Sequence, residues 1–231
     1  MFLFTNTARY GNIKKRGDII NFNIINILIS IPGVVIAVTL HEYVKSLVAY
    51  KLGDENVKKQ GRLSISPLKH MDILGAIFLL VFRFGWAKPL RVTPFSFKNQ
   101  KQSRKQAMIL LFAIPFLTNF IIGAVFAIAA NIFYMHFVTL LDIFSLEILL
   151  MIEGILFFIA FYNISFALFN IIPIYPMDGI MLLGAIKPMW AMKISQYEKI
   201  LQLVLAFFII FGFAHIVFGN FVTNIIEALS F

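Results

Sequence analysis

Long apolar runs separated by short polar stretches dominate the chain. Residues 19–50, 107–133, 148–169 and 200–218 hold few charged side chains, and each run is close to or above the ~20 residues that a helix needs to cross a bilayer. The run 73–84 is shorter, at about 12 residues, and has basic stretches on both sides. The pattern therefore predicts four transmembrane helices and one re-entrant or surface segment.

Two polar stretches complete this pattern. Residues 1–18 are polar and basic, which predicts a short tail before a single membrane-embedded domain at 19–231. Residues 54–71 are also polar, and the alternation at 62–66 predicts a short strand or hairpin that ends at Pro67. The predicted fold class is an all-α polytopic membrane protein with a small strand or hairpin and a re-entrant segment.

Composition and charge support this class. The chain is 60% hydrophobic and carries a net charge of +9. Its basic residues lie mostly at 51–106 and 187–199, between apolar runs, which is the pattern of cytoplasmic loops rather than of a nucleic-acid-binding surface. We therefore expect contact with the lipid bilayer and no nucleic acid. The basic residues at 9–16 would then lie outside, against this rule. The absence of cysteine leaves only nitrogen and oxygen ligands for any metal.

The end of the first apolar run carries the sequence His41-Glu42-Tyr43-Val44-Lys45. In the H-E-x-x-H motif of zinc proteases, two histidines four residues apart face the metal from one side of a helix, and the Glu is the general base. Here Lys45 stands at the position of the second histidine. Taken alone, the sequence is also explained by a helix that ends in water, with Glu42 and Lys45 as a surface pair.

A second polar position interrupts a later apolar run. Asp178 follows Pro173 and Pro176 and precedes Gly179. Broken backbone at membrane depth is tolerated mainly where it lines a cavity or is buried in protein. The charge-derived topology places Asp178 and His41 near the cytoplasmic ends of their segments, so we expect the two side chains to meet. A turn between two helices is the simpler alternative.

Together with their neighbours, these segments resemble the site-2 proteases, a family of intramembrane zinc metalloproteases. The resemblance covers about residues 33–190 and is nearest to the short bacterial branch without a PDZ domain. The motifs that carry it follow one another in the family's order. They are His41-Glu42, Ala49-Tyr50-Lys51-Leu52-Gly53-Asp54, Gly61-Arg62-Leu63, Pro67-Leu68-Lys69-His70, Phe84-Gly85-Trp86-Ala87-Lys88-Pro89, Pro115 with Asn119, and Asn170-x-x-Pro173-x-x-Pro176-Met177-Asp178-Gly179.

The resemblance implies a role for each matching residue. His41 and Asp178 would be zinc ligands, with Lys45 at the third ligand position, and Glu42 would polarise a zinc-bound water and carry its proton. Asn119 would hold the substrate strand or the developing oxyanion, although an interhelical hydrogen bond explains it equally well. The resemblance also implies a membrane-protein substrate or partner helix and a multi-pass protein of the bacterial cytoplasmic membrane.

Lys45 puts the zinc and the catalysis in doubt. A catalytic zinc needs three protein ligands and an open fourth position. A lysine amine binds zinc only when it is neutral, and the carboxylates of Glu42 and Asp178 favour the charged ammonium instead. Two functions therefore stay open: a protease that cleaves transmembrane or membrane-near segments, and an inactive pseudoprotease that binds such segments as a scaffold or regulator. A transporter or lipid-binding protein is a third possibility, suggested only by Asp178.

Overall fold

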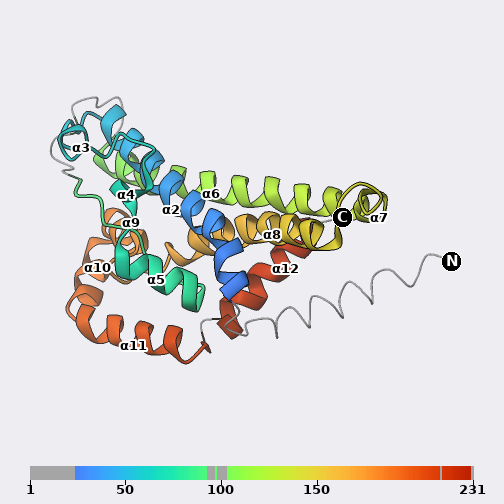
Figure 1. Ribbon diagram of the computed structural model, residues 1–231. Coiled ribbons are helices and arrows are strands. Elements are labelled where there is room, and N and C mark those ends of the chain that lie inside the picture. The colour runs from blue at the N-terminus through green and yellow to red at the C-terminus, as the bar shows by residue number, and fades with distance from the viewer. Residues whose placement is uncertain (1–23, 93–96, 98–102, 214, 230–231) are drawn as a thin grey trace.

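The computed structural model describes residues 24–92, 97, 103–213 and 215–229, and this part of the chain is built from helices. The predicted tail at 1–18 lies outside the described residues. Three helices are long and apolar enough to cross a membrane: α2 (Ile24–Lys51), α6 (Arg104–Met135) and α8 (Leu146–Phe169). They lie alongside one another in Figure 1. The all-α polytopic membrane fold is thereby confirmed.

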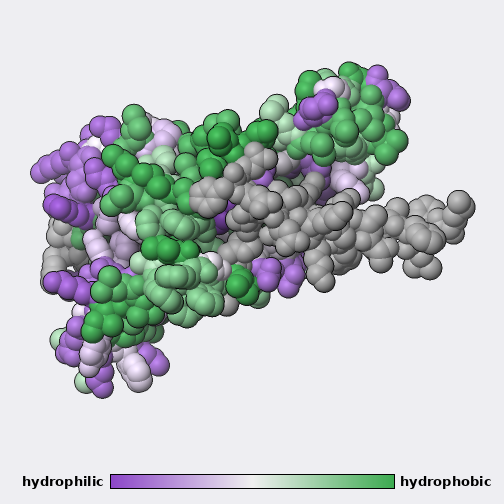
Figure 2. All heavy atoms as spheres, turned by 60° about the horizontal axis from the view of Figure 1, so that its bottom comes forward, coloured by the Kyte–Doolittle hydropathy of each residue, from purple (hydrophilic) through white to green (hydrophobic). Residues whose placement is uncertain are grey.

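Small side chains allow these three helices to pack closely. At Gly33 of α2, an added Cβ would lie 2.5 Å from the carbonyl oxygen of Phe158 in α8, so only glycine permits this approach. Val34, Ala127 and Ala160 extend the buried apolar core across α2, α6 and α8. Large apolar side chains such as Ile121 are instead exposed on the outside, where a bilayer would cover them. Figure 2 shows apolar residues over the middle of one face, many hydrophilic residues at its left-hand end and a smaller hydrophilic group at the upper right.

Helix α5 (Ile73–Phe82) has 10 residues and does not join the group of long helices. The chain turns back at Arg83, which has a left-handed backbone, and returns along α5. The amide of Lys88 then donates to the carbonyl of His70 at 2.8 Å, and Met71 forms an isolated antiparallel bridge with Ala87. The two ends of this segment therefore lie side by side, as a re-entrant segment requires.

The predicted strand or hairpin at 62–66 is wrong for the described residues. No strand forms there: the short helices α3 (Asn56–Lys59) and α4 (Pro67–His70) flank an irregular stretch. The alternation has another cause. The Arg62 side chain turns inward to bind backbone carbonyls, and Pro67 begins α4.

The predicted single helix at 200–218 is also wrong. Helix α11 (Glu198–Ile210) ends before Gly212, which has φ of 78° and no atom within 4 Å of the position of a Cβ. A π-helix (His215–Gly219) and α12 (Asn220–Leu229) follow. Because α11 has 13 residues and a helix rises ~1.5 Å per residue, it covers only about 20 Å and is too short to cross a bilayer alone.

The remaining helices sit at the two ends of the long ones. Helix α7 (Phe137–Leu140) connects α6 with α8 at one end. At the other end, α9 (Asp178–Ile186) and α10 (Pro188–Ser195) lie next to the start of α6, as do α3 and α4 in Figure 1. The charge pattern of the sequence predicts that this second end faces the cytoplasm. It is also the end that holds the motif residues.

Candidate metal centre

The last third of α2 places three polar side chains inside the protein. His41, Glu42 and Lys45 are all less than 5% exposed, so the surface-pair explanation of this motif is excluded. One edge of the His41 ring packs against Phe166 of α8, with ring centroids 5.1 Å apart. Spacings of three and four residues put Lys45 one turn after His41 and Glu42, on the same face of the helix.

Asp178 reaches this face because the chain between α8 and α9 folds tightly. The amide of Gly179 donates to the carbonyl of Asn170 at 2.7 Å, which closes the loop. An added Cβ at Gly179 would lie 2.0 Å from the carbonyl oxygen of Ile171, so a larger residue cannot occupy this position without a shift. The closed loop places Asp178 at the first residue of α9, beside the end of α2.

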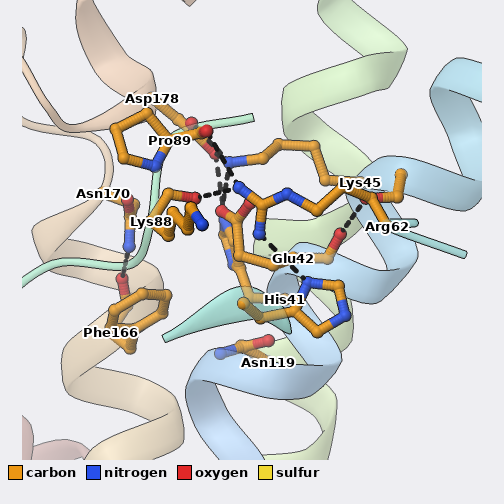
Figure 3. A network of polar contacts seen from close by, with 12 residues as sticks. His41, Glu42, Lys45, Arg62, Lys88, Pro89, Asn119, Phe166, Asn170 and Asp178 are labelled. Carbon is orange, nitrogen blue, oxygen red and sulfur yellow. Dashed lines mark hydrogen bonds and ion pairs between the residues drawn. The ribbon is translucent and has the colours of Figure 1, made fainter. Parts of the chain in front are cut away.

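The four side chains form one polar cluster, which Figure 3 shows from close by. His41 Nε2 lies 2.9 Å from Asp178 Oδ2. Lys45 Nζ donates to both oxygens of Asp178, at 2.9 and 3.1 Å, and also to Glu42 Oε1. The expected meeting of His41, Lys45 and Asp178 is therefore confirmed, across the 137 positions that separate the first from the last.

The donor set can be compared with the requirements of zinc. One ligand atom each from His41, Glu42 and Asp178 lies within 4.8 Å of the others, which is close enough for a shared ion. However, the Lys45 ammonium contacts both carboxylates from within the same cluster. A divalent cation at that place would meet a positive charge and would compete for the same oxygens. With Lys45 in this position, the residues do not fit a catalytic zinc.

Arg62 is a second buried cation beside the cluster, and it is only 4% exposed. Its guanidinium donates to the carbonyls of Lys88 at 2.6 Å and Pro89 at 2.9 Å, and also to the carbonyl of Lys69. Burial lowers the pKa of Arg62, and the nearby carboxylate of Glu42 acts in the opposite direction. Arg62 therefore adds positive charge near Glu42, but its hydrogen bonds go to backbone carbonyls, whereas Lys45 pairs directly with both carboxylates.

The resemblance includes Arg62 in the motif Gly61-Arg62-Leu63, but the sequence alone predicts no role for this residue. A basic residue in a loop is usually solvated, so its burial could not be read from its position. The signal that could have found it is the pair of motifs that it joins. Its partners Lys69, Lys88 and Pro89 all lie in other segments of the same resemblance.

Asn119 of α6 lies next to α2 and is fully buried. Its amide nitrogen donates to the carbonyl of Ala37 at 3.0 Å, one turn before His41. Its amide oxygen has no partner among the described residues. The interhelical hydrogen bond is thus present, and a role towards a substrate stays a prediction.

Comparisons with known proteins relate the chain to a protein named as a zinc metalloprotease. The chain is 31% identical over 169 residues to a protein of Bacillus subtilis (strain 168) named "Putative zinc metalloprotease YwhC", and the match covers 71% of this chain and 72% of that protein. No model of a known protein family matches the chain, and no solved structure matches it. At this identity and coverage, the chain belongs to the zinc metalloprotease family that includes the Bacillus protein.

Proposed function

We propose that this protein is a metal-free member of the site-2 protease branch of the zinc metalloproteases. In this proposal it resides in the bacterial cytoplasmic membrane and binds transmembrane or membrane-near peptide segments without cleaving them. Three kinds of support meet here: the ordered motifs, the relative named a zinc metalloprotease, and the three helices long enough to span.

One observation carries the metal-free part. Lys45 Nζ lies 2.9 Å from Asp178 Oδ1 and also donates to Glu42, so one ammonium contacts both carboxylates. Two carboxylates at this distance favour the charged amine, and a charged amine has no lone pair for zinc. Lys45 thus supplies the positive charge that a zinc ion would otherwise supply. It cannot activate a water molecule as zinc does.

The proposal that the protein binds peptide segments rests on polar groups that the chain retains around the cluster. Asp178 is 14% exposed at its side chain, so the cluster lies at the edge of the protein rather than sealed within it. The buried amide oxygen of Asn119 and the buried carboxylate oxygen Oε2 of Glu42 have no partner among the described residues. A buried acceptor without a partner requires an explanation, and the backbone N–H groups of a peptide that enters between α2 and α6 would supply one.

An active protease is the second candidate, and one observation favours it. His41, Glu42 and Asp178 bring their ligand atoms within 4.8 Å of one another. If Lys45 lost its proton or moved aside, these three residues could hold an ion, and Glu42 would then serve as ligand rather than as base. The two candidates differ in whether the purified protein contains zinc.

The zinc content of the purified protein separates the two candidates. The full chain, purified in detergent and mildly dialysed, is compared with its Lys45→His variant by elemental analysis. We expect almost no zinc in the wild type and about one per chain in the variant, because histidine restores a third ligand. Lys59→His, on the exposed face of α3, controls for zinc bound by an added imidazole alone. About one zinc per wild-type chain would refute the metal-free function.

A further inference from the structure

A groove with a different set of lining residues lies next to the polar cluster of His41, Glu42, Lys45 and Asp178. It has a volume of about 840 Å³ and lies between the start of α6 and the two short helices α9 and α10. We call it the α9–α10 groove. Its volume falls within the ~300–1,000 Å³ typical of small-molecule sites. Met181 and Met192, which line it, are exposed, so a ligand can reach it from outside the protein.

The walls of the groove are apolar and its rim is positively charged. Met108, Met181 and Met192 contribute flexible apolar surface, and Gly184 leaves space between α9 and α10. Thioether side chains adapt to irregular apolar ligands. Lys105 lies at the rim together with Arg104, and no Asp or Glu is among the described lining residues. The groove therefore offers a long apolar surface next to positive charge.

The position of these cations is costly for the helices that carry them. Arg104 and Lys105 lie in the first turn of α6, which contains no acidic residue. Lys187 precedes Pro188 at the start of α10, whose first turn also contains no acidic residue, but it does not line the groove. The start of a helix carries partial positive charge, so cations there are unfavourable and an anion is favourable. An anion bound beside Lys105 would offset part of this repulsion.

The position of the groove in the molecule indicates the chemical class of this anion. The groove lies at the end of the bundle that the charge pattern assigns to the cytoplasmic membrane surface, where α6 enters the bilayer. Trp190 and Lys193 of α10, with the ammonium 5.8 Å from the ring, are residues typical of this interface. A ligand there would have its charge at the surface and its apolar part in the bilayer. Phospholipids with an anionic headgroup have this arrangement of a charged group and apolar chains.

We propose that the α9–α10 groove binds an anionic phospholipid. The headgroup phosphate lies against Lys105, and an acyl chain runs along Met108, Met181 and Met192. The site is independent of zinc and of the residues around Lys45, so it holds whether or not the protein cleaves peptides. Its effect would be to attach α9, which carries Asp178, to the membrane surface.

Photo-crosslinking identifies the occupant directly. A benzophenone side chain replaces Met192 in the full chain, which is reconstituted in vesicles of phosphatidylglycerol and phosphatidylcholine with identical acyl chains. Mass spectrometry then gives the ratio of the two lipids in the adduct. We expect the ratio of phosphatidylglycerol to phosphatidylcholine in the adduct to be about five times the ratio in the vesicle, since one surface cation contributes ~1 kcal/mol. The same label at Ile121, on the outer face of α6, should report the bulk ratio.

Two variants test the details of the site. Lys105→Gln should return the ratio at position 192 to the bulk value, whereas Lys59→Gln on α3 should leave the enrichment unchanged. Gly184→Leu should reduce lipid adducts of both kinds, because its side chain fills the groove. Excess inorganic phosphate should not compete, since it lacks the acyl chain. Bulk lipid ratios at position 192, competition by phosphate, a peptide or second protein chain in the adduct, or no adduct would each overturn the proposal.

Discussion

Lys45 and Arg62 are both 4% exposed, yet their side chains have different kinds of partner. Lys45 contacts the carboxylates of Glu42 and Asp178. Arg62 instead contacts backbone carbonyls of Lys88 and Pro89, which belong to the return segment after α5, residues 84–91. One cation neutralises buried negative charge, and the other fixes the path of the chain. Substitutions at the two positions should therefore affect the protein in different ways: loss of Lys45 should lower its overall stability, and loss of Arg62 should loosen one segment of the chain.

The largest effect is expected for Lys45→Met. This change leaves two carboxylates without their ammonium, and removal of one partner of a buried ion pair typically costs ~3–5 kcal/mol. Denaturant unfolding of the full chain in detergent measures the loss. Adding Glu42→Gln to the Lys45→Met variant removes one of the two unpaired carboxylate charges. The double variant should therefore recover part of the lost free energy of unfolding. Equal stability of Lys45→Met and wild type at neutral pH would show that Lys45 does not balance this charge.

A smaller and more local effect is expected for Arg62→Met. The variant leaves the carbonyls of Lys69, Lys88 and Pro89 without their donor, at a cost of about 2–3 kcal/mol, because part of the lost hydrogen bonding is replaced by water. The return segment near Lys88 should then be cleaved faster in limited proteolysis. Arg91→Met, at an exposed position of the same segment, is the matched control. An unchanged cleavage pattern would contradict the role of Arg62 as a clamp.

The smallest effect concerns pH and His70, which lies beside Arg62. Arg62 Nη1 donates to His70 Nδ1 at 3.5 Å, so in the neutral ring the other nitrogen, Nε2, donates to the Ser64 carbonyl. Burial lowers the pKa of His70; the charges of Arg62 and Lys45 act in the same direction, whereas Ser64 and Glu42 oppose it. The unfolded chain therefore binds this proton more readily than the folded one.

Stability contributed by His70 should be complete above its ordinary pKa of about 6.5 and should fall as the pH drops below it. Unfolding of wild type and His70→Gln, compared between about pH 7.5 and about pH 5.5, measures this contribution. The wild type should lose more stability than the variant across this window. Parallel curves for the two proteins would show that His70 does not contribute to the pH dependence.

The sequence predicted the long elements well because their cause is local. Runs of apolar residues longer than a bilayer specify α2, α6 and α8 without reference to the rest of the chain. The meeting of His41 with Asp178 was also predictable, since a lone charged group in an apolar setting needs a partner and the motifs named it.

The errors arose where distant contacts decide the structure. Alternation at 62–66 resembled a strand, but no strand lies beside it among the residues that the structure describes. The Arg62 side chain instead donates to carbonyls more than 20 residues later in the chain. The apolar composition of 200–218 gave no sign of a break, yet Gly212 adopts a left-handed backbone that ends the helical turn. Neither the inward turn of Arg62 nor the break at Gly212 follows from hydropathy alone.

The Lys45 ammonium supplies the positive charge that a metal ion would otherwise supply between Glu42 and Asp178. The zinc affinity of the protein tests this claim most directly. Wild type and Lys45→His are titrated with zinc against a coloured chelator in detergent, and the unfolding midpoint is followed in parallel. The variant should bind zinc and gain about 2.7 kcal/mol of stability when zinc reaches ~100 times its dissociation constant. The wild type should show neither effect. Zinc binding by the wild type as tight as that of the variant would contradict the claim.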